Sequence, residues 1–315
     1  MGIEQPKRLR RYLHPLMDDK QWDAINLRDD DVIIVSAIKA GTTWLQTIVA
    51  NLIFQADGLP GAVMDISPWV ERYRDAQQME GMVAQLENQT HRRFLKTHLP
   101  LDALTYSPRV KYVFIGRDPR DVFVSLFNHH QNYSDERVQL HHDIAVKLGL
   151  RWPDMPTEIH AFFERWINDP YFEWEAEGTP YWSVFYHCNS WWQFRDVPNL
   201  KLVHYDLLLN NPRATIAEIA AFLDITVDES FWPTLLNNVS FDFMKSNGEV
   251  VMGQAQQSFK GGAGTFINRG QSGGWRDILT PQENARYQEA ARNALLPAAR
   301  HWLECGELDQ PVSQV

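Results

Sequence analysis

Short apolar runs alternate along this chain with longer stretches whose apolar residues recur at helical spacing. The run Val32–Val35 follows Asp31 and is typical of a strand that is buried on both faces. The next segment, residues 42–55, carries a single helical stripe of apolar side chains: Trp44, Leu45, Ile48, Val49, Leu52 and Ile53. This part of the pattern therefore predicts a strand followed by a helix.

Three further strands are predicted at Arg93–Lys96, Lys111–Ile115 and Leu200–Tyr205. Asp118 and Pro119 follow the second of these and suit the N-cap and first turn of a helix. Strands that alternate with helices indicate an α/β fold with a parallel sheet covered on both faces. No repeat or long linker divides the chain, so we predict one domain over residues 1–315, with a lead-in at 1–30 and a tail at 300–315.

The charge and the cysteines narrow the function classes. The 30 basic and 40 acidic residues leave a net charge of −10, which argues against a non-specific nucleic-acid binder. Cys188 and Cys305 lie in no metal-binding spacing and suggest a reducing, cytoplasmic environment. Neither a signal peptide nor an apolar run of transmembrane length is present, so we expect no stable membrane anchor.

Two regions stand out by composition. The middle of the chain holds six tryptophans, which either form core helices or line an apolar substrate pocket: Trp152, Trp166, Trp174, Trp182, Trp191 and Trp192. Residues 260–275 contain six of the 17 glycines and are predicted to be a loop.

The junction between the first strand and helix carries the clearest chemistry. Free backbone N–H groups and the helix dipole favour an anion there, Gly41 permits close approach, and Lys39, Thr42 and Thr43 add a charge and hydroxyls. The Walker A loop differs, because its lysine follows the glycine and precedes a serine or threonine that holds Mg²⁺. The segment therefore favours a smaller anion and no obligatory metal.

Four segments together resemble the cytosolic sulfotransferases, including their bacterial members, over about residues 30–290. Lys39–Trp44 resembles the KSGTTW loop, Lys96–Pro100 the KTHLP segment, Arg117–Ser125 the RNPKDVxVS segment and Asn268–Trp275 the RKGxxGDW segment. Each segment occurs in the family's order. The resemblance implies transfer of a sulfonate group from 3′-phosphoadenosine 5′-phosphosulfate (PAPS) to a hydroxyl, which leaves PAP.

The resemblance also implies catalytic roles. Lys96 and His98 are two residues apart at a strand end and project to the same face. A histidine there can take a proton from the acceptor, since its reference pKa of about 6.5 is near neutral pH. We expect His98 to be the general base and Lys39 and Lys96 to stabilise the reacting oxygens. The other ten histidines, His129 among them, lack such a context and are expected to be structural or on the surface.

The remaining binding residues come from the resemblance as well. Arg117 and Ser125, with Arg269 and Gly270, would hold the 3′-phosphate. Asn268 stands where the family usually has arginine, which implies a weaker grip on that phosphate. The adenosine pocket would consist of Trp44, Tyr205, Ser240, Phe241 and Phe266.

Two other functions remain open at this point: a P-loop-type nucleotide kinase using ATP and Mg²⁺, and a non-catalytic nucleotide-binding protein. The acceptor pocket is expected from residues 59–87, 131–180 and 244–264, whose aromatic residues suggest a small, largely apolar acceptor such as a phenol, an alcohol or a lipid-linked hydroxyl. The oligomeric state is open, because Pro281 and Ala285 depart from the family's dimerisation signature.

Overall fold

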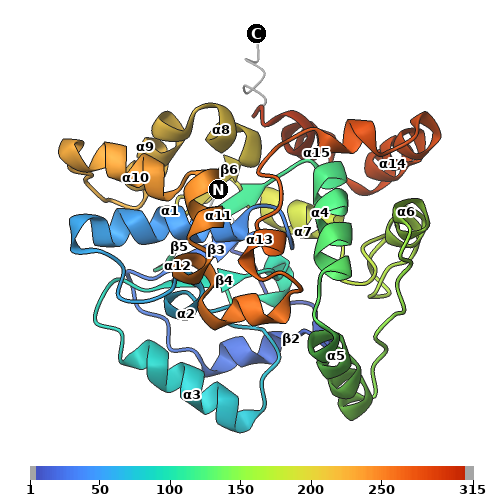
Figure 1. Cartoon of the computed structure of the whole chain (residues 1–315), viewed down its shortest axis with the longest axis horizontal. Coiled ribbons are helices and arrows are strands. Elements are labelled where there is room, and N and C mark those ends of the chain that lie inside the picture. The colour runs from blue at the N-terminus through green and yellow to red at the C-terminus, as the bar shows by residue number, and fades with distance from the viewer. Residues whose placement is uncertain (1–4, 309–315) are drawn as a thin grey trace.

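A computed structural model describes residues 5–308, and its centre is a parallel four-stranded sheet (Figure 1). The strands are β3 Val32–Val35, β4 Phe94–Thr97, β5 Lys111–Gly116 and β6 Leu200–His204, in the order β4-β3-β5-β6. The four predicted strands are thus confirmed to within one residue at each end, and so is the α/β fold class.

Alternate residues of β3, one of the two inner strands, enter different halves of the core. Ile33 and Val35 belong to one apolar cluster, and Val32 and Ile34 belong to a second. Both clusters are extended by helices, so the sheet is covered on both faces, as its continuous apolar strands require.

The helices follow the strands in the predicted alternation. Helix α1 begins at the predicted Thr42, and Asp118 caps α4 with Pro119 in its first turn. The α-helices have these bounds: α1 Thr42–Phe54, α2 Val63–Ile66, α3 Ala76–Glu87, α4 Pro119–Gln131, α5 Asp135–Leu148, α6 Ile159–Asn168, α7 Val184–Trp192, α8 Tyr205–Asn210, α9 Pro212–Phe222, α10 Trp232–Asn238, α11 Phe241–Ser246, α12 Gly248–Met252, α13 Ala263–Phe266, α14 Pro281–Ala294 and α15 Pro297–Cys305.

The two ends of the described chain pack into the core. Near the start, β1 Leu13–His14 pairs antiparallel with β2 Met17–Asp18, and Tyr12 beside them is fully buried. The expected tail is wrong for residues 300–305, because these lie in α15 and its Trp302 is buried against β5. Residues 309–315 of that tail lie outside the described part.

Two other expectations are resolved by the packing. The glycine-rich segment is mostly loop, but residues 263–266 form the short helix α13, so the prediction of an uninterrupted loop is wrong there. The six central tryptophans pack in or against the core, which decides for the core interpretation. Two of them, Trp182 and Trp191, donate their ring N–H groups to the carbonyls of His98 and Leu99.

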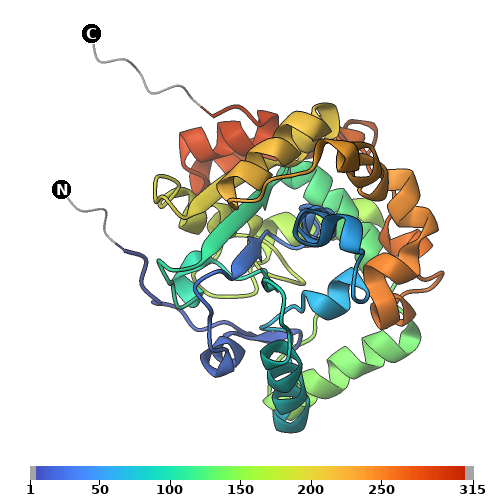
Figure 2. The ribbon, with the colours of Figure 1, turned by 90° about the vertical axis from the view of Figure 1, so that its left-hand side faces the viewer.

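Helices α11 to α13 cross in front of the sheet in Figure 1, and the quarter turn of Figure 2 shows the same segment standing clear of the sheet on one side. This places residues 241–266 over the carboxyl ends of the strands. Among residues 5–308 no helix has the length and apolar character that a membrane crossing demands. Both cysteines are free.

Candidate active site

One cavity of about 1280 Å³ lies at the carboxyl ends of the parallel strands. Lys39 follows β3, His98 follows β4, Arg117 follows β5 directly and Tyr205 follows β6 directly. Parallel strands bring such residues to the same edge, which is where open α/β sheets bind ligands. The cavity is lined by every residue that the sequence predicted for catalysis or binding: Lys39, Gly41, Thr42, Thr43, Trp44, Lys96, His98, Arg117, Ser125, Tyr205, Ser240, Phe241, Phe266, Asn268, Arg269 and Gly270.

The turn after β3 contains two residues with positive φ and is bridged by a pair of hydroxyl groups. Lys39 has a φ of 68° and Gly41 a φ of 114°, and a Cβ on Gly41 would lie 2.9 Å from the Tyr205 ring. The hydroxyl of buried Thr42 bonds to that of Ser36 at the end of β3, whereas Thr43 is half-buried at the cavity wall. The turn therefore presents the start of α1 to the cavity.

Three cations meet at this cavity without a carboxylate partner. The Lys39 ammonium lies 3.9 Å from the centre of the Phe266 ring, the Lys96 ammonium 5.4 Å from Trp69, and the Arg117 guanidinium 4.2 Å from Tyr205. Within residues 5–308 none of the three forms an ion pair. Unpaired buried charge is costly, so this arrangement favours an anionic ligand.

Burial dominates the ionisation of both lysines. The pKa of Lys39 is lowered to about 7, mainly by burial and then by the nearby charges of Lys96 and Arg117. The pKa of Lys96 is lowered to about 8 by burial, which the charge of Glu71 partly opposes. Both lysines thus lie near their titration range at neutral pH.

His98 has the orientation of a proton acceptor. The side chain is 4 % exposed, and its Nδ1 lies 2.8 Å from the carbonyl oxygen of Ser36. A carbonyl only accepts, so Nδ1 carries the proton of the neutral ring and Nε2 keeps its lone pair. Burial, followed by the charge of Lys96, lowers the pKa of His98 well below its usual value, which keeps the ring neutral.

Glu71 positions the His98 segment and was missed by the sequence analysis. Its carboxylate accepts hydrogen bonds from the His98 backbone N–H at 2.6 Å, from the Thr97 hydroxyl at 3.2 Å and from the Trp22 ring N–H at 2.8 Å. These donors are far from Glu71 in sequence, so no local signal marks it.

His129 lines the cavity, although it was expected to be structural or on the surface and was not singled out from the sequence. Its Nε2 accepts from the Tyr133 hydroxyl at 2.9 Å, and Tyr133 in turn accepts from Tyr181. Its Nδ1 is buried without a partner in the described structure. Ser125 lies four residues earlier on the same helix, and that spacing was the available signal.

The Arg117 guanidinium joins the β5 end to the glycine-rich loop. It donates to the carbonyl of Gln271 at 2.7 Å and to that of Lys39 at 3.4 Å, while its Nε is buried without a partner. Arg117 forms no ion pair with the nearby carboxylate of Asp118, which pairs with Arg120 instead.

Asp121 anchors the same loop. Its carboxylate accepts from the Ser272 hydroxyl at 3.1 Å and from the backbone N–H groups of Gly273 and Trp275 at 2.7 and 3.3 Å. Gly270 lies under the Phe241 ring, where a Cβ would come within 2.2 Å of a ring carbon. Loop and aromatic ring thus form one wall of the cavity.

Aromatic side chains from α1 and from the residue after β6 form one end of the cavity. Trp44 meets Tyr205 edge to face at 5.1 Å between ring centres, and its ring N–H donates to the carbonyl of Val239 at 2.8 Å. Ser240 caps α11 by accepting from Phe243. These residues offer a flat apolar surface beside Arg117.

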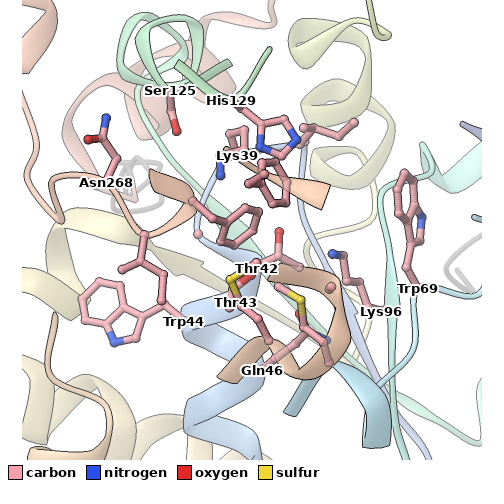
Figure 3. Close-up of a pocket in the computed structure, with 18 of the residues that line it drawn as sticks. Lys39, Thr42, Thr43, Trp44, Gln46, Trp69, Lys96, Ser125, His129 and Asn268 are labelled. Carbon is pink, nitrogen blue, oxygen red and sulfur yellow. The ribbon is translucent and has the colours of Figure 1, made fainter. Parts of the chain in front are cut away.

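Figure 3 shows how the site is arranged: in this view Ser125, Asn268 and Trp44 lie to one side of Lys39, and Lys96 and Trp69 lie to the other. Asn268 stands where the family usually has arginine, but a positive charge lies close to it. The Lys245 ammonium donates to the Asn268 carbonyl at 3.1 Å. Among the described residues no group of three or more His, Cys, Asp or Glu side chains is arranged to hold a metal ion.

The chain has clear relatives among characterised proteins. It is 30% identical to glycolipid sulfotransferases of Mycobacterium bovis and Mycobacterium tuberculosis, over 97% of this chain and 98% of each relative. Human sulfotransferase 2A1 is 28% identical over 83% of this chain and 82% of its own.

Solved structures show the same fold. Mouse sulfotransferase SULT7A1, complexed with PAP, superposes with a TM-score of 0.67 at 21% identity and covers 90% of this chain and 91% of its own. Retinol dehydratase with androsterone and PAP superposes with a TM-score of 0.65 at 22% identity, over 88% of this chain and 84% of its own. The model of the sulfotransferase domain matches residues 29–298, so this chain belongs to the sulfotransferase domain family.

Proposed function

We propose that this chain transfers the sulfonate group of PAPS to a hydroxyl of a small, largely apolar acceptor and releases PAP. The observation that carries the proposal is the convergence of Lys39, Lys96 and Arg117, without carboxylate partners, beside a neutral histidine. Two structurally similar relatives were crystallised with PAP, which supports this choice of anion.

The residues present fit such a nucleotide. Arg117 has a buried Nε without a partner, and an arginine fork suits a phosphate; with Ser125, Arg269 and Gly270 it would hold the 3′-phosphate. Lys39, which precedes α1, would hold the 5′-phosphate together with Thr42 and Thr43 in the first turn of that helix. Trp44 and Tyr205, with Ser240, Phe241 and Phe266, would enclose the adenosine.

The mechanism follows from the protonation states. PAPS, when bound, supplies the sulfonate group that is transferred in line. His98 Nε2 removes the acceptor's hydroxyl proton, since Nδ1 is fixed by Ser36. The Lys39 ammonium balances charge at the oxygen that bridges to the 5′-phosphate, and Lys96 neutralises the sulfonate oxygens.

The acceptor is proposed from the cavity wall. The three expected segments all contribute to it, for example through Met64, Tyr133 and Phe259. The relatives named as glycolipid sulfotransferases support a lipid-linked hydroxyl among the candidates. We also propose a cytoplasmic location, which the two free cysteines support.

Replacing His98 tests the mechanism. We expect His98→Ala to slow sulfonate transfer from labelled PAPS by roughly 10²–10⁴-fold across a panel of phenols, alcohols and glycolipids, because the general base is lost. PAP affinity, measured by calorimetry, should stay within about twofold. His142→Ala on α5 is the matched control, since it lies outside the cavity lining. Transfer by His98→Ala at the rate of the unaltered protein would contradict the role.

A chelator separates this proposal from the nucleotide kinase. Sulfonate transfer by the residues above needs no metal, so we expect activity with PAPS to persist in excess EDTA. ATP-dependent phosphate transfer that stops on adding EDTA would favour the kinase instead.

A further inference from the structure

Two arginines line the same cavity and have no part in the mechanism above. Arg72 follows the segment that pairs Trp69 with Lys96, and Arg137 lies in the first turn of α5. Both side chains are half-buried. They come from two of the segments expected to form the acceptor pocket.

Neither arginine has a partner in residues 5–308. No ion pair and no hydrogen bond engages the guanidinium group of Arg72 or Arg137, and the Nε of Arg137 is buried without an acceptor. The neighbouring Arg74 shows the contrast, because its Nη1 donates to the carbonyls of Trp69, Val70 and Arg72 at 2.9–3.0 Å. Arg74 is thus structural, whereas the other two guanidinium groups are unused.

The charges around this pair are not balanced. The pKa of Arg72 is lowered to about 10, mainly by burial and then by the positive charges of Arg137 and Arg74. Burial also lowers the pKa of Arg137. The groups that act in the opposite direction are the hydroxyls of Tyr133 and Tyr181, not carboxylates. Two like charges held together without an anion destabilise the protein unless a ligand neutralises them.

Trp69 links Arg72 to the proposed general base His98. Trp69 meets the His98 ring edge to face at 5.0 Å between ring centres, and its carbonyl accepts from the Arg72 backbone N–H. On the other wall, Tyr133 bonds to His129 and lies in the field of Arg137. In Figure 3, Trp69 and Lys96 lie away from Ser125 and Asn268. Because the charge of Arg72 acts on Lys96, we place Arg72 at the Lys96 end of the cavity and not at the predicted 3′-phosphate site.

We propose that Arg72 and Arg137 bind an anionic group of the acceptor, a carboxylate, phosphate or sulfate, while the acceptor's hydroxyl faces His98. This inference rests on the proposed function and refines its substrate class: the acceptor is amphiphilic rather than uniformly apolar. Its apolar part would pack against the ring pair Tyr133 and Phe259, whose centres are 5.5 Å apart. Guanidinium forks match the geometry of such oxyanions.

Calorimetry on the PAP-saturated protein tests this binding without requiring turnover. PAP occupies the nucleotide site, and phenyl phosphate, phenyl sulfate and benzoate are then titrated, with benzyl alcohol as the neutral probe. We expect at least one anion to bind, and Arg72→Met and Arg137→Met each to weaken it tenfold or more. Arg213→Met is the matched control, because Arg213 pairs with Glu229 on the surface.

The outcomes decide between the proposals. If none of the three anions binds to the PAP-loaded protein, or if the Met variants bind them as the unaltered protein does, the inference is wrong although the proposed function stands. If PAP itself does not bind, the proposed function fails. The anion with the highest affinity identifies the acceptor group.

Folding controls keep the result interpretable. Removing an unpaired charge should leave the melting temperature of Arg72→Met unchanged or higher, whereas Arg74→Met should lower it. PAP affinity should stay within twofold in Arg72→Met and Arg137→Met. Should a Met variant fold poorly, Arg72→Lys and Arg137→Lys keep the charge without the fork, and we expect them to weaken anion binding at least threefold; unchanged binding in them contradicts the proposal.

Discussion

At the scale of single residues, the site is a set of ionisable groups whose protonation is set by burial. Lys39, Lys96 and His98 lie together, and burial lowers the pKa of each. Burial thereby keeps the histidine neutral, which the proposed role as general base requires, and it leaves both lysines able to gain a proton when an anion binds.

PAP binding should therefore take up protons above neutral pH. With a pKa of about 7, Lys39 is mainly neutral at pH 8, and a bound phosphate favours its charged form. We expect proton uptake at pH 8, much less at pH 6, and an affinity that falls by up to roughly tenfold per pH unit above 7. Calorimetry in two buffers of different ionisation enthalpy measures the uptake.

Lys39→Met should reduce that uptake, leaving the contribution of Lys96, whose pKa is about 8. Equal uptake by Lys39→Met and the unaltered protein would show that Lys39 does not meet the phosphate. The same lowered pKa predicts that the protein without nucleotide gains stability from about pH 7 toward the unfolded-state pKa of 10.5, since only unfolded Lys39 binds a proton there.

At the scale of elements, strand ends and one loop assemble the site. Arg117 at the end of β5 donates to Gln271 of the glycine-rich loop, and Asp121 on α4 accepts three hydrogen bonds from that loop. The loop is thus fixed to the sheet by polar contacts, although its composition favours no regular structure.

Gly270 tests whether the loop wall matters for nucleotide binding. It has a φ of 62° and packs against Phe241, so an added Cβ forces the ring or loop to move. We expect Gly270→Ala to weaken PAP binding by roughly 5–100-fold, corresponding to about 1–3 kcal/mol of strain.

Gly264→Ala is the control in the same loop, because nothing lies within 4 Å of its added Cβ. It should bind PAP within about twofold of the unaltered protein. Similar affinities for the two variants, measured by calorimetry, would remove Gly270 from the proposed 3′-phosphate site and Phe241 from the proposed adenosine pocket.

At the scale of the whole molecule, the last helix supports the sheet under the site. Trp302 of α15 packs against Phe114 of β5, with ring centres 5.6 Å apart, and fills the space beside Gly116. Arg117 follows immediately, so helix and site are linked through the end of β5.

Truncation of Trp302 should therefore lower the stability of the whole domain. We expect Trp302→Ala to reduce the free energy of unfolding by about 3–5 kcal/mol, because a fully buried aromatic leaves a cavity. Urea denaturation measures the change, and the adjacent, half-buried His301→Ala should alter it by less than about 1 kcal/mol. A Trp302→Ala protein as stable as the unaltered one would show that α15 is dispensable.

The local sequence pattern alone was sufficient to predict the strands, the start of α1 and the Asp118 cap. Both burial on two faces and helix capping depend on residues that are neighbours in the sequence. The convergence of Lys39, His98 and Arg117 was also predictable, since parallel strands bring their carboxyl ends to one edge. Their roles in catalysis stay predictions.

Long-range packing decided the rest. Trp182 and Trp191 beside His98 turned out to be core and not pocket. Glu71 holds the His98 backbone, and His129, Arg72 and Arg137 reach the cavity, although the periodicity of their segments gives no sign of either. Which polar side chain ends without a partner depends on every element packed around it. The residues at the nucleotide end of the site could therefore be predicted from the sequence. At the acceptor end the sequence predicted only the contributing segments, because the folded contacts decide which side chains of those segments line the cavity.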